Sequence, residues 1–387
     1  MIPFHVMAKP SGAKCNLDCK YCFYLEKEGL YPHGNLRMSD TVLEAYVQQQ
    51  IALVPEGGEV LFAWQGGEPT LMGLDFFERA VALQKKYARG RRIANAFQTN
   101  GVLLDREWAA FLKREEFLVG ISIDGPRELH DLYRVDKGGK PTFHKVMRGL
   151  DSLREHAVAF NTLTVVHQES ARRPMEVYSF LKEIGSTHLQ FIPLVERTGT
   201  DRLVSEASVL PQDYGSFLCT IWNHWIRWDV GRIFVQLFDV MLGVWLGRPA
   251  SLCLFRETCG NAVALEHNGD VYSCDHFVTP AHRIGNLMEE GLAHSVRSEQ
   301  QQAFGKIKRE SLPKYCRECN VRFACHGECP KNRFMLTPDG EPGLNYLCAA
   351  YKQFFTHANA GLRGMAWLVL HRESPAKIME IMRETAA

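Results

Sequence analysis

Short apolar runs and amphipathic stretches alternate over roughly the first 235 residues of this 387-residue chain. The runs have the length and the β-rich content of buried strands, and the stretches between them show the apolar spacing of helices. Strands are expected at 60–64, 93–99, 117–124, 160–167 and 188–193, and helices at 74–87, 105–113 and 174–184. Repeated strand–helix units imply an α/β fold with a parallel sheet and right-handed crossovers, and six such units would make a partial (β/α)6 barrel.

Polar and glycine-containing turns follow three of these strands. They are Gln65-Gly66-Gly67-Glu68-Pro69, Gln98-Thr99-Asn100-Gly101 and Ser122-Ile123-Asp124-Gly125. Because α/β folds place their active sites at the carboxyl ends of strands, we expect these turns to border a functional site. For Asp124, an ordinary capping or solvent-exposed position explains the residue equally well.

Three cysteines lie close together near the start of the chain, in Cys15-Asn16-Leu17-Asp18-Cys19-Lys20-Tyr21-Cys22. Three thiolates on one loop can hold three corners of a cubane iron–sulfur cluster and leave the fourth iron open to a substrate, whereas clusters used only for electron transfer normally have four cysteines. A structural zinc site is the alternative, but it needs a second group of ligands, and the next cysteine is Cys219.

Composition narrows these alternatives. The formal net charge of +1 offers no broad basic field for nucleic acid and no polybasic patch for a membrane. The N-terminus lacks the charged region and apolar run of a signal peptide, and no stretch approaches the roughly 20 apolar residues of a membrane helix. We therefore expect a cytoplasmic protein whose twelve cysteines serve metal or redox chemistry rather than disulfides.

A second group of cysteines occupies the segment from about 250 to 350, where the apolar periodicity becomes weak. There are eight, enough for two four-cysteine sites: Cys253, Cys259, Cys274, Cys316, Cys319, Cys325, Cys329 and Cys348. A segment so rich in loops needs metal to fold, and two zinc knuckles would satisfy the same count as two iron–sulfur clusters. The remaining Cys219 lies in the aromatic-rich segment 212–246, which we interpret as a helical packing face rather than an aromatic cage, with Cys219 as a buried thiol.

The loop at 15–22 resembles the signature of the radical SAM enzymes. The later spacing, C-x9-G-x4-C followed by C-x2-C-x5-C-x3-C and a final cysteine, resembles the SPASM extension of that family. The resemblance implies a radical SAM partial barrel over 1–235, a SPASM domain over 236–350 and a C-terminal helical segment over 351–387. It implies three 4Fe–4S clusters, one held by Cys15, Cys19 and Cys22, one by Cys253, Cys259, Cys274 and Cys329, and one by Cys316, Cys319, Cys325 and Cys348.

The same resemblance implies a binding site for S-adenosylmethionine at the open iron. Gly66, Gly67 and Glu68 match the turn that holds its α-amino group, and Ser122 and Arg134 match the residues that hold its carboxylate. The resemblance places Tyr21 near the adenine, Gln98 and Asn100 along the ribose and substrate cavity, and Tyr24 and Gln65 facing the substrate. For Tyr24 and Gln65, a packing role is an equal alternative.

From Met7 to about Cys348 the chain resembles the anaerobic sulfatase-maturating enzymes. That family oxidises a Cys or Ser side chain of a sulfatase to Cα-formylglycine, through a 5′-deoxyadenosyl radical that takes a hydrogen atom from Cβ. Asp275, directly after Cys274, matches the proposed general base, although an exposed carboxylate after a turn would look the same. The implied partners are an unfolded or nascent sulfatase polypeptide and an electron donor such as flavodoxin or ferredoxin.

Two other functions stay open at this point. A SPASM peptide maturase that makes thioether or carbon–carbon cross-links would share the fold and clusters, but such enzymes often carry an extra N-terminal recognition domain, for which a loop starting at Cys15 leaves no room. A non-catalytic iron–sulfur carrier or zinc-bound interaction protein is the more distant alternative, because neither has a use for the three-cysteine loop and the turn at Gly66–Pro69.

Overall fold

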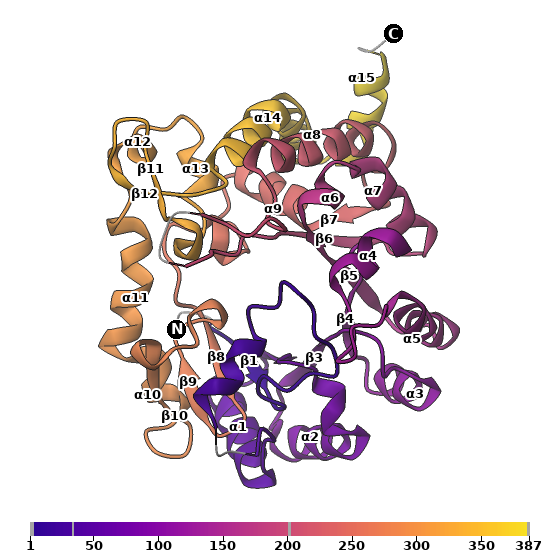
Figure 1. Cartoon of the computed structure of the whole chain (residues 1–387), viewed down its shortest axis with the longest axis vertical. Coiled ribbons are helices and arrows are strands. Elements are labelled where there is room, and N and C mark those ends of the chain that lie inside the picture. The colour runs from indigo at the N-terminus through magenta and orange to yellow at the C-terminus, as the bar shows by residue number, and fades with distance from the viewer. Residues whose placement is uncertain (1–3, 33–34, 200–202, 385–387) are drawn as a thin grey trace. The chain divides into compact units, whose positions relative to one another are not determined.

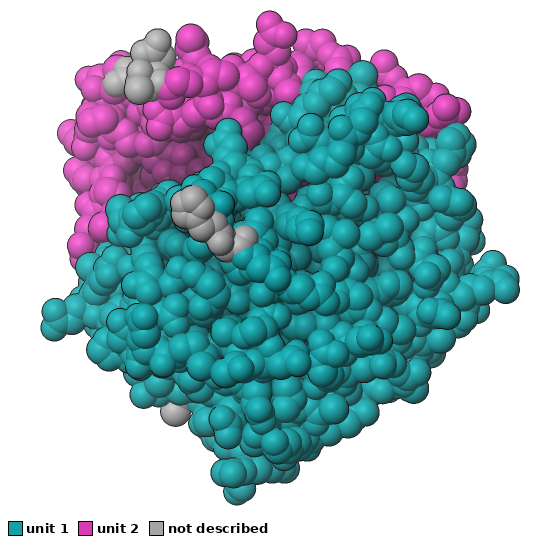
Figure 2. Space-filling model, turned by 60° about the horizontal axis from the view of Figure 1, so that its bottom comes forward, with its two compact units in different colours: residues 1–122, 131–160, 260–306 teal, residues 123–130, 161–259, 307–387 magenta. Residues whose placement is uncertain are grey.

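The computed structural model describes residues 4–32, 35–199 and 203–384. The chain forms two compact units, each assembled from segments far apart in sequence (Figure 2). Unit 1 comprises residues 1–122, 131–160 and 260–306, and unit 2 comprises residues 123–130, 161–259 and 307–387. The domain boundaries at 235 and 350 stay predictions.

The sheet of unit 1 runs in the order β10-β9-β8-β1-β2-β3-β4. Its strands are β1 (His5–Lys9), β2 (Glu59–Trp64), β3 (Arg92–Thr99), β4 (Leu118–Ser122), β8 (Ala262–Glu266), β9 (Asp270–Tyr272) and β10 (Arg283–Asn286). The neighbours from β8 to β4 pair in parallel, as the strand–helix pattern predicts, and β9 and β10 add antiparallel pairs. Strands β8 to β10 come from the cysteine-rich part of the sequence and extend the sheet beyond β1.

Helices cover the sheet of unit 1, and Figure 1 shows α1 and α2 side by side next to it. Trp64 at the end of β2 is fully buried between them, packs against Phe76 and Phe77, and donates its indole N–H to Asn95 at 2.8 Å. The helices are η1 (Leu25–Leu30), α1 (Asp40–Ala52), η2 (Pro69–Met72), α2 (Leu74–Tyr87), α3 (Arg106–Arg114), α5 (Phe143–Glu155), η4 (Asp275–Phe277), η5 (Pro280–His282) and α10 (Leu292–Arg297). Two more, α4 (Arg127–Tyr133) and α11 (Glu299–Glu310), contribute residues to both units.

Unit 2 contains the parallel strands β5 (Phe160–Val166), β6 (His188–Pro193) and β7 (Phe234–Val235) and the short antiparallel pair β11 (Met335–Leu336) and β12 (Pro342–Leu344). Its longest helices, α8 (Pro211–Trp228) and α14 (Cys348–Leu370), pack together (Figure 1). The others are α6 (Gln168–Ala171), α7 (Pro174–Glu183), α9 (Gln236–Trp245), η3 (Cys253–Phe255), α12 (Lys314–Arg317), α13 (Arg322–Cys325), η6 (Pro330–Asn332), η7 (Pro375–Lys377) and α15 (Ile378–Glu384).

The aromatic-rich segment forms a packing face. Trp222, Trp225 and Phe238 are buried with ring centroids 5.1–5.3 Å apart, and Phe354 of α14 joins them. Cys219 is buried on α8, as predicted. This confirms the packing interpretation and leaves no open cage between these rings. Within the part of the chain that the structure describes, no helix is both long and apolar enough to cross a membrane.

Candidate functional site

The three-cysteine loop follows β1 directly, at the carboxyl end of the sheet. The Leu17 N–H donates to Cys15 Sγ at 3.3 Å, and the Asn100 amide nitrogen lies 3.7 Å from the same sulfur. Burial, together with the nearby carboxylate of Glu68, raises the pKa of Cys15 to about 12. A thiol in this environment loses its proton readily only when a metal takes its place, so this donor set fits a cluster.

The Gly-Gly-Glu-Pro turn is docked onto the cysteine loop through its backbone. The Gly67 N–H donates to Gly12 O at 2.8 Å, and the Glu68 N–H donates to Lys14 O at 2.9 Å. A Cβ atom on Gly67 would lie 2.1 Å from Lys14 O, which no real contact permits. Glycine at position 67 therefore lets the two loops meet, and the predicted cofactor turn and the predicted cluster loop form one site.

Glu68 ties the ends of β2 and β3 together. Its carboxylate is fully buried, and Oε1 accepts hydrogen bonds from Thr70 N, Thr70 Oγ1 and Thr99 Oγ1 at 2.7–3.0 Å. Oε2 accepts the Asn100 N–H at 2.7 Å. Burial raises the pKa of Glu68, while these hydrogen bonds act in the opposite direction. Oε1 accepts three of these bonds and Oε2 only one, so Oε2 is the oxygen with more room for a further donor such as an ammonium group.

Two of the other predicted cofactor residues, Arg134 and Asn100, contact the same loop. The guanidinium of Arg134 lies 5.6 Å from the ring centroid of Tyr21, and Asn100 Nδ2 donates to Asn16 Oδ1 at 2.7 Å. Ser122 is buried at the end of β4, and Gln98 is partly buried on β3. Contacts of these side chains with S-adenosylmethionine stay predictions.

Asp124 has a structural role in unit 2. It is fully buried, and its Oδ1 accepts the Val165 N–H at 2.9 Å.

Lys9 brings together three residues that the sequence indicated separately. It ends β1 and is 2% exposed. Its Nζ lies 2.5 Å from Asp275 Oδ1, donates to Gln65 Oε1 at 3.4 Å, and lies 4.5 Å from the ring centroid of Tyr24. Sequence reasoning missed Lys9, although a lysine at the carboxyl end of a strand, six residues before the first cysteine, is a signal that could have indicated it.

Glu266, at the end of β8, is a second residue that sequence reasoning missed. Its buried carboxylate accepts a hydrogen bond from the Tyr24 hydroxyl. Burial raises the pKa of Tyr24, and the charges of Glu266 and Asp275 raise it further, so Tyr24 is a neutral phenol in this cluster. Glu266 carries no motif, and only the parallel pairing of β8 with β1 brings it beside Tyr24.

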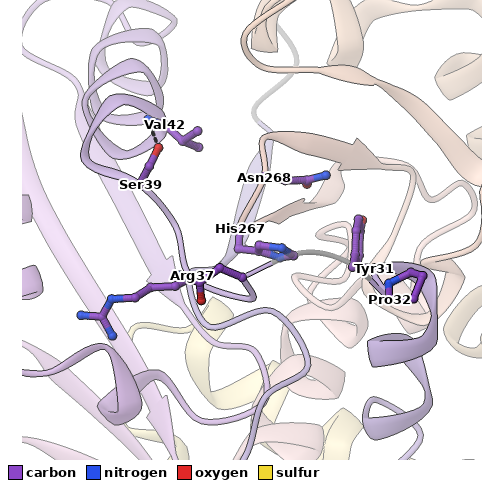
Figure 3. Close-up of a pocket in the computed structure, with 8 residues that line it drawn as sticks. Tyr31, Pro32, Arg37, Ser39, Val42, His267 and Asn268 are labelled. Atoms are coloured by element: carbon purple, nitrogen blue, oxygen red, sulfur yellow. Dashed lines mark hydrogen bonds between the residues drawn. The ribbon is translucent and has the colours of Figure 1, made fainter.

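Unit 1 also contains an open pocket of about 430 Å³ (Figure 3). Its wall includes His267, whose Nδ1 lies 3.4 Å from Glu266 Oε2, and Tyr31, whose hydroxyl lies 2.7 Å from that of Tyr272. Arg37 also lines the pocket, but its guanidinium donates to the backbone carbonyls of Leu71 and Met72. None of the predicted site residues lines this pocket.

Four of the later cysteines line a single cavity in unit 2. They are Cys316, Cys319, Cys325 and Cys348, the set that the family resemblance assigns to one cluster. Burial raises the pKa of Cys325 to about 12 and of Cys348 to about 11, with neighbouring thiolates adding to both. Of the other set, Cys253, Cys259 and Cys329 belong to unit 2 and Cys274 to unit 1.

Among the residues with described positions, no three His, Cys, Asp or Glu side chains converge on one point where a single metal ion could bind. A zinc ion requires its sulfur ligands at about 2.3 Å from one centre. A four-iron cluster binds each thiolate at a different corner, so it suits cysteines spread around a cavity.

Comparison with known proteins identifies the family. The Radical SAM superfamily matches residues 10–181, and SPASM, an iron–sulfur cluster-binding domain, matches residues 253–320. A serine-type anaerobic sulfatase-maturating enzyme of Bacteroides thetaiotaomicron is 45% identical over 399 residues, which cover 99% of this chain and 96% of that protein. The chain belongs to the anaerobic sulfatase-maturating enzymes. A cysteine-type member of the family, from Clostridium perfringens, is 36% identical over 92% of this chain and 97% of its own length.

Solved structures agree with this assignment to the anaerobic sulfatase-maturating enzymes. Native anSMEcpe with bound AdoMet and the Cp18Cys peptide has a TM-score of 0.84 and 34% identity, covering 95% of this chain and 99% of that one. Streptococcus suis SuiB bound to its precursor peptide SuiA has a TM-score of 0.60 at 16% identity, a likeness of fold alone. The predicted family and the predicted α/β fold with radical SAM and SPASM domains are confirmed, and both domain matches support the predicted cofactors, S-adenosylmethionine and iron–sulfur clusters.

Proposed function

We propose that this chain oxidises a Ser or Cys side chain of an unfolded or nascent sulfatase polypeptide to Cα-formylglycine. The observation that carries the proposal is the cluster at the end of β1, where Lys9 contacts Asp275, Gln65 and Tyr24 beside the cysteine loop. Relatives named as serine-type and as cysteine-type enzymes both match over almost the whole chain, which supports either target residue.

The reaction removes two electrons and two protons from the target side chain: one of each leaves with the hydrogen atom, the second proton goes to Asp275, and the second electron would pass to an auxiliary cluster. A serine target then gives the aldehyde directly, whereas a cysteine target gives a thioaldehyde, which water hydrolyses to the aldehyde with release of hydrogen sulfide. When bound at the cysteine loop, the cluster and S-adenosylmethionine supply a 5′-deoxyadenosyl radical that takes a hydrogen atom from Cβ. The turn at Gly66, Gly67 and Glu68 positions the amino-acid end of the cofactor, and Ser122 and Arg134 bind its carboxylate. Gln65 and Tyr24 face the peptide.

Asp275 accepts the remaining proton after the hydrogen atom has left Cβ. An ordinary Asp has a pKa of about 3.9 and a thiol of about 8.5, so transfer from an unactivated thiol would cost about 6 kcal/mol, and more from a serine hydroxyl. A radical on the neighbouring carbon makes the S–H or O–H group more acidic and reduces this cost. Lys9 holds the carboxylate in place, with its Nζ 2.5 Å from Asp275 Oδ1.

The reducing electron for cofactor cleavage comes from a small redox protein of the flavodoxin or ferredoxin type, and the enzyme acts in the cytoplasm on chains that have not folded. Both statements follow from the family and from the composition of the chain. They are separable from the chemistry, which a chemical reductant can drive in vitro.

The test uses anaerobically reconstituted enzyme, S-adenosylmethionine, a strong reductant, and a Cys-x-Pro-x-Arg peptide beside its Ser analogue. Mass spectrometry follows the peptide, and chromatography follows 5′-deoxyadenosine. We expect aldehyde and 5′-deoxyadenosine to form together with at least one peptide. Cofactor cleavage with both peptides unchanged would contradict the substrate and favour a cross-linking peptide maturase, whereas no cleavage at full iron content would contradict the catalytic assignment.

A further inference from the structure

The helix α11 buries the ammonium group of Lys308 among the later cysteines. Lys308 is 0% exposed, and its Nζ donates to the backbone carbonyl oxygens of Cys253 and Leu254 at 2.6 and 2.7 Å. An ammonium group has three donors, and these two neutral carbonyls use two of them. Within the described residues, Lys308 forms no salt bridge with a carboxylate.

Arg333, which is half-buried, also donates to backbone carbonyls next to Lys308. Its guanidinium donates to the backbone carbonyl oxygens of Lys308, His326 and Gly327 at 2.6–2.8 Å and of Glu328 at 3.1 Å. In the described part of the chain it too lacks a carboxylate partner at salt-bridge distance. One buried carboxylate is near, that of Glu328, but it is held by the side-chain amides of Asn332 and Asn345.

A buried cation, a half-buried cation and one buried carboxylate thus lie close together, which leaves an excess of positive charge. Removing an ion from water costs several kcal/mol, and hydrogen bonds to neutral carbonyls offset only part of this cost. A region built in this way needs an anion beside it. The groups placed to supply it belong to cysteines: Lys308 Nζ lies 2.6 Å from the carbonyl oxygen of Cys253, and Arg333 lies 2.7 Å from the carbonyl oxygen of His326, which follows Cys325.

A 4Fe–4S cluster held by four thiolates is an anion in both of its oxidation states, and reduction adds a further negative charge. A cation fixed nearby therefore stabilises the reduced state more than the oxidised state. We propose that Lys308 raises the reduction potential of the auxiliary cluster held by Cys253 and Cys259, with Arg333 extending the positive field toward the second cysteine set. Lys308 thereby favours transfer of one electron onto this cluster, whichever peptide is oxidised.

The test is a redox titration, monitored by electron paramagnetic resonance, of the anaerobically reconstituted full chain. The main variant is Lys308→Gln, which removes the charge but keeps a donor for the carbonyl of Cys253. We expect the equilibrium constant for reduction of one auxiliary cluster to fall at least about tenfold, which is about 59 mV for a one-electron couple. Lys308→Arg should restore the native potential, and Lys306→Met, at an exposed lysine two residues earlier on α11, should leave it unchanged.

Unchanged potentials in Lys308→Gln at native iron and sulfide content would overturn the proposal. Arg333→Gln is titrated in parallel. If Lys308→Gln binds less iron, the cluster potential of Arg333→Gln decides: a lower potential supports the proposal, and an unchanged potential overturns it. Cleavage of S-adenosylmethionine without peptide should continue in all variants, because it depends on the loop at Cys15–Cys22. Failure of this inference is therefore distinct from failure of the proposed function.

Discussion

Replacing Lys9 by Met removes the ammonium group that contacts Asp275, Gln65 and Tyr24 but keeps an unbranched side chain of similar size. The Lys9 side chain is 3% exposed and that of Asp275 is 19% exposed, so water reaches the carboxylate but hardly reaches the amine. Breaking a buried ion pair costs about 3–5 kcal/mol, and water that reaches the Asp275 carboxylate replaces part of the lost contact. We take about 1.5–2 kcal/mol, which corresponds to a loss of about 10- to 30-fold in the step that Asp275 assists.

The assay is the ratio of 5′-deoxyadenosine to formylglycine under single-turnover conditions. We expect aldehyde formation by Lys9→Met to fall about 10- to 30-fold while cofactor cleavage changes less than about threefold, so that the ratio rises. Lys9→Arg should recover part of the coupling because it keeps the charge. Lys14→Met, at an exposed lysine beside Cys15, is the matched control and should behave as native.

A native ratio and a native rate in Lys9→Met would refute the reasoning. It would mean that the contact between Lys9 and Asp275 has no part in the oxidation. A parallel loss of cleavage and aldehyde would also contradict it, because Lys9 would then support the cofactor site rather than the later proton transfer.

Three further outcomes are expected. Asp275→Asn should still cleave S-adenosylmethionine and exchange hydrogen with the peptide but form little aldehyde, and normal turnover would disprove the base assignment. Gly67→Ala should lose cofactor cleavage because its Cβ would collide with Lys14 O. The control Gly29→Ala, with no atom within 4 Å of its Cβ, should cleave the cofactor at the native rate. Burial raises the pKa of Cys219 to about 11, so at pH 8 about one thiol in a thousand is ionised. Alkylation of Cys219 by iodoacetamide in the holoenzyme should therefore be negligible at pH 8 and should accelerate as the pH rises. Fast labelling of Cys219 at pH 8, detected by peptide mapping, would contradict this.

The strand–helix pattern predicted individual elements of the sheet well. The helix at 74–87 and the strand at 188–193 have the predicted bounds, and the other predicted elements agree within two residues at each end. These elements are long or strongly apolar, so their periodicity is readable. Strands β8 to β10 were not predicted because they have only three to five residues, too few to show alternation, and because β8 pairs with β1 across more than 250 residues of sequence.

The chemistry of the site was predictable to the extent that local motifs carry it. The spacing of Cys15, Cys19 and Cys22 and the turn at Gly66–Glu68 match local motifs of the family for the groups that we propose they bind, and such motifs are visible in the sequence alone. Lys9 and Glu266 have no such motif. Their significance comes from where the sheet places them.

The sequence by itself determined the family and the parallel α/β pattern, because the spacing of Cys15, Cys19 and Cys22 and the alternation of strands and helices are short-range constraints on neighbouring residues. The division of the later cysteines into two sets follows from the family resemblance and stays a prediction. Only the tertiary structure decided that Lys9 joins Asp275 to Gln65 and Tyr24, and that Lys308 is buried beside cysteines with no carboxylate partner among the described residues. The physical reason is that a buried charge is defined by its three-dimensional surroundings. A lysine on a strand end or a helix reads the same in sequence whether it faces water or the interior.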